Sequence, residues 1–237
     1  MKLDLLRRLN EARARRAAAM LLTDMASGEE RLVVEAEGHA GDPLREEIGA
    51  RFRSGASGMG PAGGTAAGTF FTVHLPPPRL VVIGAAHISQ ALALMAKIAG
   101  FDMTVIDPRT AFATPERFPD VALIAEWPDV ALPKIGLDEF TALAVVSHDP
   151  KIDDLPLTEA LKAGCFYVGA LGSRKTHARR LERLRAAGVD EAKLGRIHAP
   201  IGVAIRAQSP AEIAVAILAQ VIGALRSRGL ASAEAAA

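Results

Sequence analysis

The spacing of hydrophobic positions changes several times along the first third of the chain. Residues 2–16 place leucines at helical spacing among arginine and glutamate, which predicts an amphipathic helix. Apolar runs at Ala18–Leu22 and Arg31–Val34 flank a polar turn with a glycine and predict a pair of strands. Pro43–Phe52 predicts a second helix with proline near its first position, and Phe70–Leu75 predicts a further strand.

Two segments rich in glycine or proline interrupt these elements. Ser54–Gly68 consists mostly of glycine and other small residues, which predicts an exposed, mobile loop. Pro76–Pro78 is a stiff polyproline stretch, and the hydrophobic pattern is different after it. We therefore place a domain boundary there, with a small α+β domain at residues 1–75 and a second domain at residues 79–237.

In the second domain, short apolar segments alternate with helical ones. Strands are expected at Arg79–Gly84, Phe101–Ile106, Val121–Ala125, Leu143–Val146 and Phe166–Val168, and helices from the first strand to Lys97, at Leu155–Lys162 and at Arg174–Ala186. This alternation indicates βαβ units and a Rossmann-like parallel sheet that is covered on both faces. Ser209–Glu212 is a capping box with proline at its second position, and it predicts the start of a final apolar helix buried in the core.

Composition excludes several classes of protein. With 28 basic and 27 acidic residues the net charge is +1, which argues against a nucleic-acid-binding protein. The single cysteine, Cys165, excludes disulfide frameworks and multi-cysteine metal sites, and we expect no metal ligands. No apolar run reaches the roughly 20 residues of a membrane span, and the N-terminal apolar stretch is too short for a secretory signal. We expect a soluble cytoplasmic protein.

The charge is unevenly distributed. Gly172–Arg196 holds eight basic and three acidic residues, whereas Phe101–Ala160 holds four basic and twelve acidic residues. The whole chain is thus nearly neutral because a basic segment and an acidic segment cancel each other's charge. This near-neutrality does not argue against a small anionic ligand that binds the basic segment.

The turn after the first strand of the second domain is a candidate cofactor site. Gly84–Ser89 lies where a dinucleotide-binding G-x-G-x-x-G turn is expected, between a strand and a helix. Ala86 and Ser89 replace the second and third glycines of that pattern. We expect Gly84, Ala86 and His87 to contact a cofactor, with His87 as a proton donor to phosphate. A Rossmann-type turn that binds nothing is the alternative.

Asp107 ends the next strand, 23 positions after Gly84, and Arg109 follows closely. An acidic residue at this position binds the ribose in dinucleotide-binding folds, and the guanidinium group is suited to neutralising a phosphate. An ion pair confined to the loop is the alternative. If a nicotinamide cofactor binds here, the protein is an NAD(P)-dependent oxidoreductase or a nucleotide-sensing protein.

A second polar group follows the strand that ends at Val146. Ser147, His148 and Asp149 lie in a row, and neighbouring residues cannot form a hydrolase triad, so we expect no catalytic residues here. We expect His148 and Asp149 to orient a ligand at the carboxyl end of the strand.

The segment Tyr167–Lys175 carries the strongest local signal. It joins a strand through a glycine- and serine-containing turn to a helix whose first turn has two cations. Free N–H groups, the helix dipole and the cations together favour phosphate binding, although a solvated helix face is the alternative. The residues expected to bind the cofactor here are Gly169, Gly172, Ser173, Arg174 and Lys175.

Taken in order, several motifs are similar to those of the xanthine dehydrogenase accessory factor family (XdhC/CoxI), over about residues 70–225. These are Leu80–His87, Asp107–Arg109, Ser147–Asp149, Tyr167–Arg174, Ala199–Gly202 and Ser209–Ala214. The resemblance implies an accessory protein rather than a catalyst. It implies binding of the molybdenum cofactor, as molybdopterin or its dinucleotide form, and support for its sulfuration and insertion into a molybdenum hydroxylase of the xanthine or carbon monoxide dehydrogenase type.

The same resemblance implies two partners, the hydroxylase apoenzyme and a cysteine desulfurase. The apolar helix at Ile213–Leu225 is a separate reason to expect a homodimer. The sequence also departs from the family pattern. Residues 1–75 contain no cysteine, whereas the family has a cysteine-containing segment in a fuller N-terminal domain. Ala86 stands where the family tends to have glycine, and Ala204 and Arg206 stand where it tends to have aspartate and glycine. These differences predict a divergent member with altered ligand choice.

Overall fold

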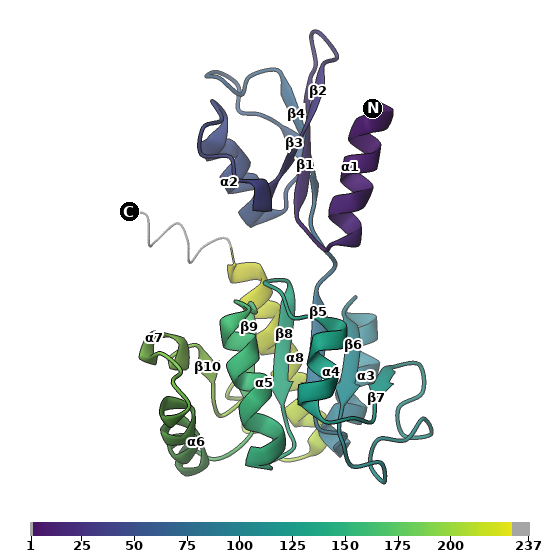
Figure 1. Cartoon of the computed structure of the whole chain (residues 1–237), viewed down its shortest axis with the longest axis vertical. Coiled ribbons are helices and arrows are strands. Elements are labelled where there is room, and N and C mark those ends of the chain that lie inside the picture. Colours follow the sequence, from purple (N-terminus) through teal and green to yellow (C-terminus); the bar gives the residue numbers. More distant parts are fainter. Residues whose placement is uncertain (1, 229–237) are drawn as a thin grey trace. The chain divides into compact units, whose positions relative to one another are not determined.

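The structure is a computed structural model that describes residues 2–228 of the chain (Figure 1). Among the described residues it contains two compact units, one built on residues 2–76 and the other spanning Pro77–Arg226. Each unit has its own sheet: the first sheet has four strands and the second has six.

The first unit is an antiparallel sheet with strand order β2-β1-β4-β3. Its strands and helices are α1 (Leu3–Ala14), β1 (Ala19–Asp24), β2 (Glu30–Val34), the 3₁₀ turn η1 (Glu35–Glu37), α2 (Arg45–Ser54), β3 (Gly58–Met59) and β4 (Thr69–His74). Helix α1 packs leucines against one face of β1 and β2, so the predicted amphipathic helix and strand pair are confirmed.

Helix α2 confirms the second predicted helix, and it begins at Arg45, two residues after Pro43. The segment Ser54–Gly68, predicted as a loop, contains the short strand β3, which pairs with β4. The Arg51 guanidinium organises this segment by donating hydrogen bonds to the carbonyl oxygens of Ala56 and Met59. The glycine content of the segment gave no indication of these hydrogen bonds from the Arg51 side chain.

The second unit is a parallel sheet with strand order β10-β9-β8-β5-β6-β7. Its strands are β5 (Arg79–Ile83), β6 (Asp102–Ile106), β7 (Ala122–Ile124), β8 (Thr141–Val145), β9 (Tyr167–Ala170) and β10 (Ile197–His198). Its helices are α3 (His87–Ile98), α4 (Pro128–Ile135), α5 (Pro150–Lys162), α6 (Arg174–Ala186), α7 (Glu191–Leu194) and α8 (Pro210–Ser227). The predicted Rossmann-like α/β fold is confirmed, whereas α4, α7 and β10 were not predicted.

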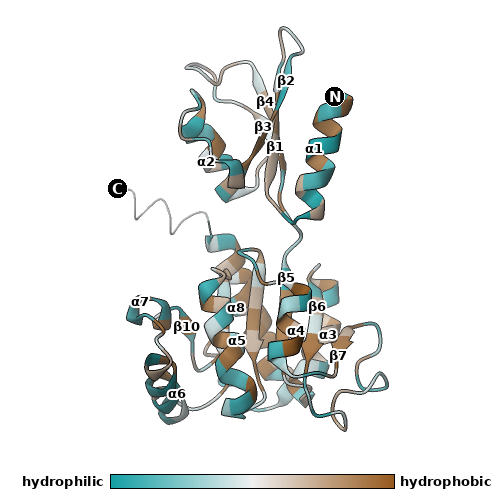
Figure 2. Ribbon diagram, viewed as in Figure 1, coloured by the Kyte–Doolittle hydropathy of each residue, from teal (hydrophilic) through white to brown (hydrophobic). Residues whose placement is uncertain are grey.

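Alternating side chains of the parallel strands enter two apolar clusters on opposite faces of the sheet. Leu80 and Val82 of β5 pack with α3 and α8, and Val81 and Ile83 pack with α4, α5, α6 and α7. Figure 2 shows the contrast between these apolar strands and the hydrophilic surface of α6. Burial on both faces is the reason why the strands have continuous apolar runs.

Helix α8 begins with the predicted capping box. The Glu212 amide donates to the Ser209 hydroxyl, and the Ser209 amide donates to the Glu212 carboxylate. One face of the helix packs in the core, as predicted, whereas Val215 and Ile222 on the helix are exposed. Among residues 2–228, α8 is long and apolar enough to pass as a membrane span by length and composition alone, but it packs against the sheet as a core helix.

Candidate functional site

Strand order reverses between β5 and β8, and this point defines a crevice at the carboxyl edge of the parallel sheet. The turn after β5 and the loop after β8 touch there. Gly84 has φ +112°, and a Cβ at this position would lie 2.9 Å from the Ser147 backbone nitrogen. Glycine is therefore needed because the two chain segments approach so closely.

The side chain of Asp107 holds this turn together. It is fully buried, and its carboxylate accepts hydrogen bonds from the Ala85 amide at 2.7 Å and the Arg109 amide at 2.9 Å. The Arg109 guanidinium donates two more, at 2.9 and 2.7 Å. Burial by itself would raise the pKa of Asp107, but these hydrogen bonds outweigh it and the pKa is lowered. A ribose hydroxyl would have to displace one of these donors.

Ser89 also acts inside the turn. Its buried hydroxyl donates to the Gly84 carbonyl oxygen and lies 3.4 Å from the Ala86 amide, which donates to it. Serine in place of the third fingerprint glycine therefore closes the turn with its own side chain. His87 is the first residue of α3, and its side chain is exposed.

The turn between β9 and α6 has the features expected of an anion site. The Ser173 hydroxyl caps α6 by accepting from the Thr176 amide at 3.2 Å, and the first turn of the helix has no acidic residue. Gly172 has φ +137°, which strongly favours glycine. Arg174 and Lys175 are exposed on the first helical turn. Gly169 lies within β9, where a Cβ would be 2.5 Å from the Tyr167 hydroxyl, so its small size is needed for packing.

A cavity of about 350 Å³ lies beside this turn. It is lined by His148, Pro150, Asp153, Lys175, Thr176, Arg179, Arg180 and Arg183. Its walls come from the β8–α5 loop, from α5 and from α6, and they carry four cationic side chains against one carboxylate. His148 has φ +66°, an uncommon conformation for a residue with a side chain. The composition of the walls suits an anionic ligand.

Arg180 is the most unusual residue of this cavity. Its side chain is 2% exposed. One terminal nitrogen, Nη2, donates to the Leu171 carbonyl oxygen at 2.9 Å, whereas Nε and Nη1 have no hydrogen-bond partner among residues 2–228. Burial lowers the pKa of the guanidinium group, and the nearby carboxylates of Asp153 and Asp154 oppose that effect. Buried donors without partners are rare, and an unbound ligand is one recognised explanation.

Asp153 lies next to Arg180 and is equally buried. Its Oδ1 atom accepts a hydrogen bond from the Ser147 hydroxyl, and its Oδ2 atom lies 3.9 Å from Nη2 of Arg180, beyond hydrogen-bonding range. Burial raises the pKa of Asp153 to about 6, against the opposing effects of the Ser147 hydrogen bond and the Arg180 charge. The neighbouring Asp154 is different, because it forms a two-pronged ion pair with Arg183 at 2.6 and 2.9 Å.

The structure brings some of the predicted site residues together and separates others. His148 and Lys175 line the cavity, whereas Asp149 caps α5 by accepting from the Lys151 amide at 3.0 Å. Sequence analysis missed Asp153, Arg179, Arg180 and Arg183. A repeat of cations every four residues at positions 175, 179 and 183 was a visible signal for one face of α6, but nothing in the sequence distinguished the buried Arg180 from them.

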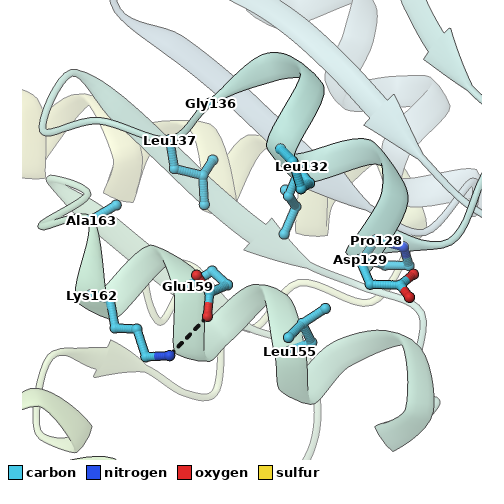
Figure 3. Close-up of a pocket in the computed structure, with 10 residues that line it drawn as sticks. Pro128, Asp129, Leu132, Gly136, Leu137, Leu155, Glu159, Lys162 and Ala163 are labelled. Carbon is cyan, nitrogen blue, oxygen red and sulfur yellow. Dashed lines mark hydrogen bonds and ion pairs between the residues drawn. The ribbon is translucent and has the colours of Figure 1, made fainter.

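Other features are less suited to a polar ligand. A recess of about 610 Å³ lies between α4 and α5, and its walls include the apolar side chains of Leu132, Leu137 and Leu155 (Figure 3). Two of its three charged residues, Glu159 and Lys162, pair with each other at 3.0 Å. Cys165 is buried and its pKa is raised to about 12, so it is not a nucleophile in the folded protein. No group of three or more His, Cys, Asp or Glu within residues 2–228 is arranged to hold a metal ion.

Comparison with known proteins identifies the family. Residues 80–221 match the XdhC Rossmann domain. The chain belongs to the XdhC family. This confirms the resemblance inferred from the motifs, and the matched residues include both the Gly84 turn and the cavity beside α6.

Named relatives agree with this assignment. "Molybdenum cofactor insertion chaperone PaoD" of Escherichia coli (strain K12) is 30% identical over 62% of this chain and 40% of its own length. A probable subunit of xanthine dehydrogenase from Bacillus subtilis (strain 168) is 31% identical over 62% of this chain and 43% of its own length. The uncharacterised YqeB of E. coli (strain K12) is 35% identical over 72% of this chain and 31% of its own length. The chain thus spans less than half of each of these relatives.

A solved structure supports the fold over nearly the whole chain. The crystal structure of a protein described as a xanthine dehydrogenase from Bacillus halodurans matches 96% of this chain and 68% of its own, with a TM-score of 0.72 and 25% sequence identity. The shared fold therefore extends beyond the Rossmann domain into the first unit.

Proposed function

We propose that this protein is a maturation factor for a molybdenum hydroxylase, which binds the phosphate group of the molybdenum cofactor at the carboxyl edge of its parallel sheet. The observation that carries the proposal is the cationic cavity beside α6, with the unpartnered nitrogens of Arg180, in a member of the XdhC family. A relative named as a molybdenum cofactor insertion chaperone supports the choice of cargo.

The chemistry of the residues fits such a cargo. Molybdopterin carries a phosphate, and its dinucleotide form carries a pyrophosphate. The amino end of α6 offers free N–H groups, and Lys175 and Arg179 make no ion pair among the described residues. Backbone N–H groups at a helix start together with cations are a common phosphate-binding arrangement. The protein's own contribution would be to hold and shield the cofactor until the hydroxylase apoenzyme takes it up.

Three parts of this proposal go beyond the comparisons: participation of a cysteine desulfurase in sulfuration, which the family resemblance implies, and a homodimeric state and a cytoplasmic location, which are expectations from the sequence. They stay predictions. The alternative of an NAD(P)-dependent enzyme has no support among the relatives. The carboxylate of Asp107, which such an enzyme would use for the ribose, already accepts four hydrogen bonds in the turn.

A cofactor-retention experiment tests the proposal. The full chain is mixed with molybdenum cofactor released from a purified hydroxylase and passed through a desalting column. The retained pterin is then oxidised and measured by fluorescence. We expect the wild-type protein to retain the pterin. The double variant Arg174→Glu, Lys175→Glu should lose at least nine-tenths of it, because two positive charges at the α6 turn become negative and the net charge falls by four units.

The matched control changes the same charge elsewhere. Arg7 lies on α1 of the first unit and Arg15 directly follows that helix, and both are exposed. Arg7→Glu, Arg15→Glu makes the same charge change, four units, at residues that do not line the cavity. We expect this variant to retain pterin like the wild type. Equal loss in both double variants would show that retention depends on overall charge, and no retention by the wild type would refute the proposal.

A further inference from the structure

The juxtaposition of Arg180 with Asp153 has a consequence for which anion the cavity accepts. Both side chains are nearly inaccessible, and both line the same cavity. Arg180 offers unpartnered donors, whereas Asp153 offers an oxygen that lies outside hydrogen-bonding range of the guanidinium group. An anion bound to Arg180 therefore meets a second acid group at close range.

Two acid groups in contact are stable only when they share a proton. A carboxylate and a fully ionised oxyanion repel each other, and burial strengthens the repulsion because water no longer screens it. With one proton between them, the same pair forms a short and strong O–H···O⁻ hydrogen bond. The anion that suits this cavity is one that brings a proton with it.

We propose that the cavity beside α6 is a binding site for a proton-bearing tetrahedral oxyanion, a hydrogen phosphate or a singly protonated phosphate monoester, with Arg180 donating to its oxygens and Asp153 accepting its O–H. The inference deepens the proposed function, since the terminal phosphate of the cofactor is the ligand that would lie there. Sulfate and molybdate have the same shape and charge but no proton at neutral pH, so Asp153 discriminates against them.

The surroundings of Asp153 are consistent with this role. The charged or titratable groups around it are His148 and Asp149 of the β8–α5 loop, Asp154 of α5, Lys175, Arg179, Arg180 and Arg183 of α6, and Arg109 after β6. Asp149 and Asp154 add negative charge and favour its protonated form, whereas Arg180 opposes it. The Ser147 hydroxyl occupies Oδ1, which leaves Oδ2 for the ligand.

Calorimetric titration of the full chain with inorganic anions tests the inference without the cofactor. Phosphate, sulfate and molybdate are titrated separately in phosphate-free buffer at about pH 6 and pH 8. Because the pKa of Asp153 is about 6, its protonated fraction falls from about one half to about one hundredth over this range. We expect sulfate and molybdate to bind about 50-fold more weakly at the higher pH, and phosphate to change only a few-fold.

Proton uptake gives a second, independent measurement. Binding heats compared in two buffers of different ionisation enthalpy report the protons taken up. At pH 8 we expect the complex to take up about one proton from solution when sulfate binds. Phosphate should cause no uptake, since hydrogen phosphate brings its own proton. Molybdate binding more tightly than phosphate at pH 8 would overturn the inference and indicate a site for the metal oxyanion. Absence of saturable phosphate binding would also overturn it.

Variants assign the effect to the two residues. Asp153→Asn keeps the shape but does not titrate, so we expect equal affinities for phosphate and sulfate and no pH dependence for sulfate. Asp102→Asn, at an exposed position of β6 that does not line the cavity, should leave the selectivity unchanged. Arg180→Lys should weaken the binding of every anion at least tenfold. Arg185 pairs with Glu191 outside the cavity, so Arg185→Lys should not change the affinity for any of them.

The outcomes separate this inference from the proposed function. If a variant does not fold, as judged by its thermal unfolding, the wild-type selectivity and proton uptake still decide the question. Selective phosphate binding without pterin retention would support the oxyanion site and refute the molybdenum cofactor as the cargo. Pterin retention without any preference for phosphate over sulfate would support the cofactor as cargo and refute the role of Asp153 in selecting the anion.

Discussion

The variant Asp153→Asn provides a test of the cavity's electrostatics in the absence of any ligand. Burial raises the pKa of Asp153 from 3.8 to about 6, so the folded protein binds this proton more tightly than the unfolded chain does. The resulting contribution to stability is complete below pH 3.8 and is lost as the pH rises through 6. Above that range, folding must bury an ionised carboxylate beside Arg180.

The size of the effect follows from the shift. A shift of about two pKa units, at about 1.4 kcal/mol each, corresponds to about 3 kcal/mol between about pH 4 and pH 8. Asparagine at position 153 keeps an oxygen that accepts from the Ser147 hydroxyl, but it does not titrate. We therefore expect the unfolding free energy of the variant to rise relative to wild type by about 3 kcal/mol over this range.

Urea denaturation followed by the fluorescence of Trp127 measures this difference. Trp127 is the only tryptophan, and it lies in the same unit as Asp153, so the signal reports the relevant domain. All other titrating groups are common to both proteins and cancel in the difference. Asp102→Asn, at an exposed position of β6 in the same unit, serves as the control and should show no such pH-dependent rise. A variant-minus-wild-type difference that stays constant, or falls as the pH rises, would refute the reasoning.

Four further predictions concern the turns, a helix and the core. Gly84→Ala should lower the unfolding free energy by about 2 kcal/mol or more, because its Cβ would meet the Ser147 backbone and its φ is +112°. Gly223→Ala, at an exposed helical position with open space around it, should raise it by up to about 1 kcal/mol in the same chemical denaturation. Asp107→Asn should cost about 2 kcal/mol, seen as a lower thermal midpoint, because two of four donated hydrogen bonds come from a cation. Cys165 should react with a thiol reagent only in denaturant, whereas rapid reaction under native conditions would contradict its burial and its raised pKa of about 12.

Local patterns in the sequence were sufficient for most of the parallel-sheet domain. Apolar runs bounded by turns located β5, β6, β8 and β9, and the boundaries of α6 were predicted to the residue at Arg174–Ala186. The capping box at Ser209 marked the start of α8. These signals depend on residues a few positions apart, so they are present before the chain folds. Helix α4 was missed because two prolines occur within its eight residues, at Pro128 and Pro133.

The sequence by itself determined the fold class, the family and the basic turn, whereas the tertiary structure decided the chemistry of the site. Whether Asp107 is free to bind a ribose depends in part on the Ala85 amide, a donor from another turn 22 residues away in the chain. Whether Arg180 is a surface cation or a buried donor depends on how α6 packs against α5, and its pairing with Asp153 spans 27 positions. Burial and electrostatic coupling arise only when distant segments meet, and for that reason no local pattern contains them.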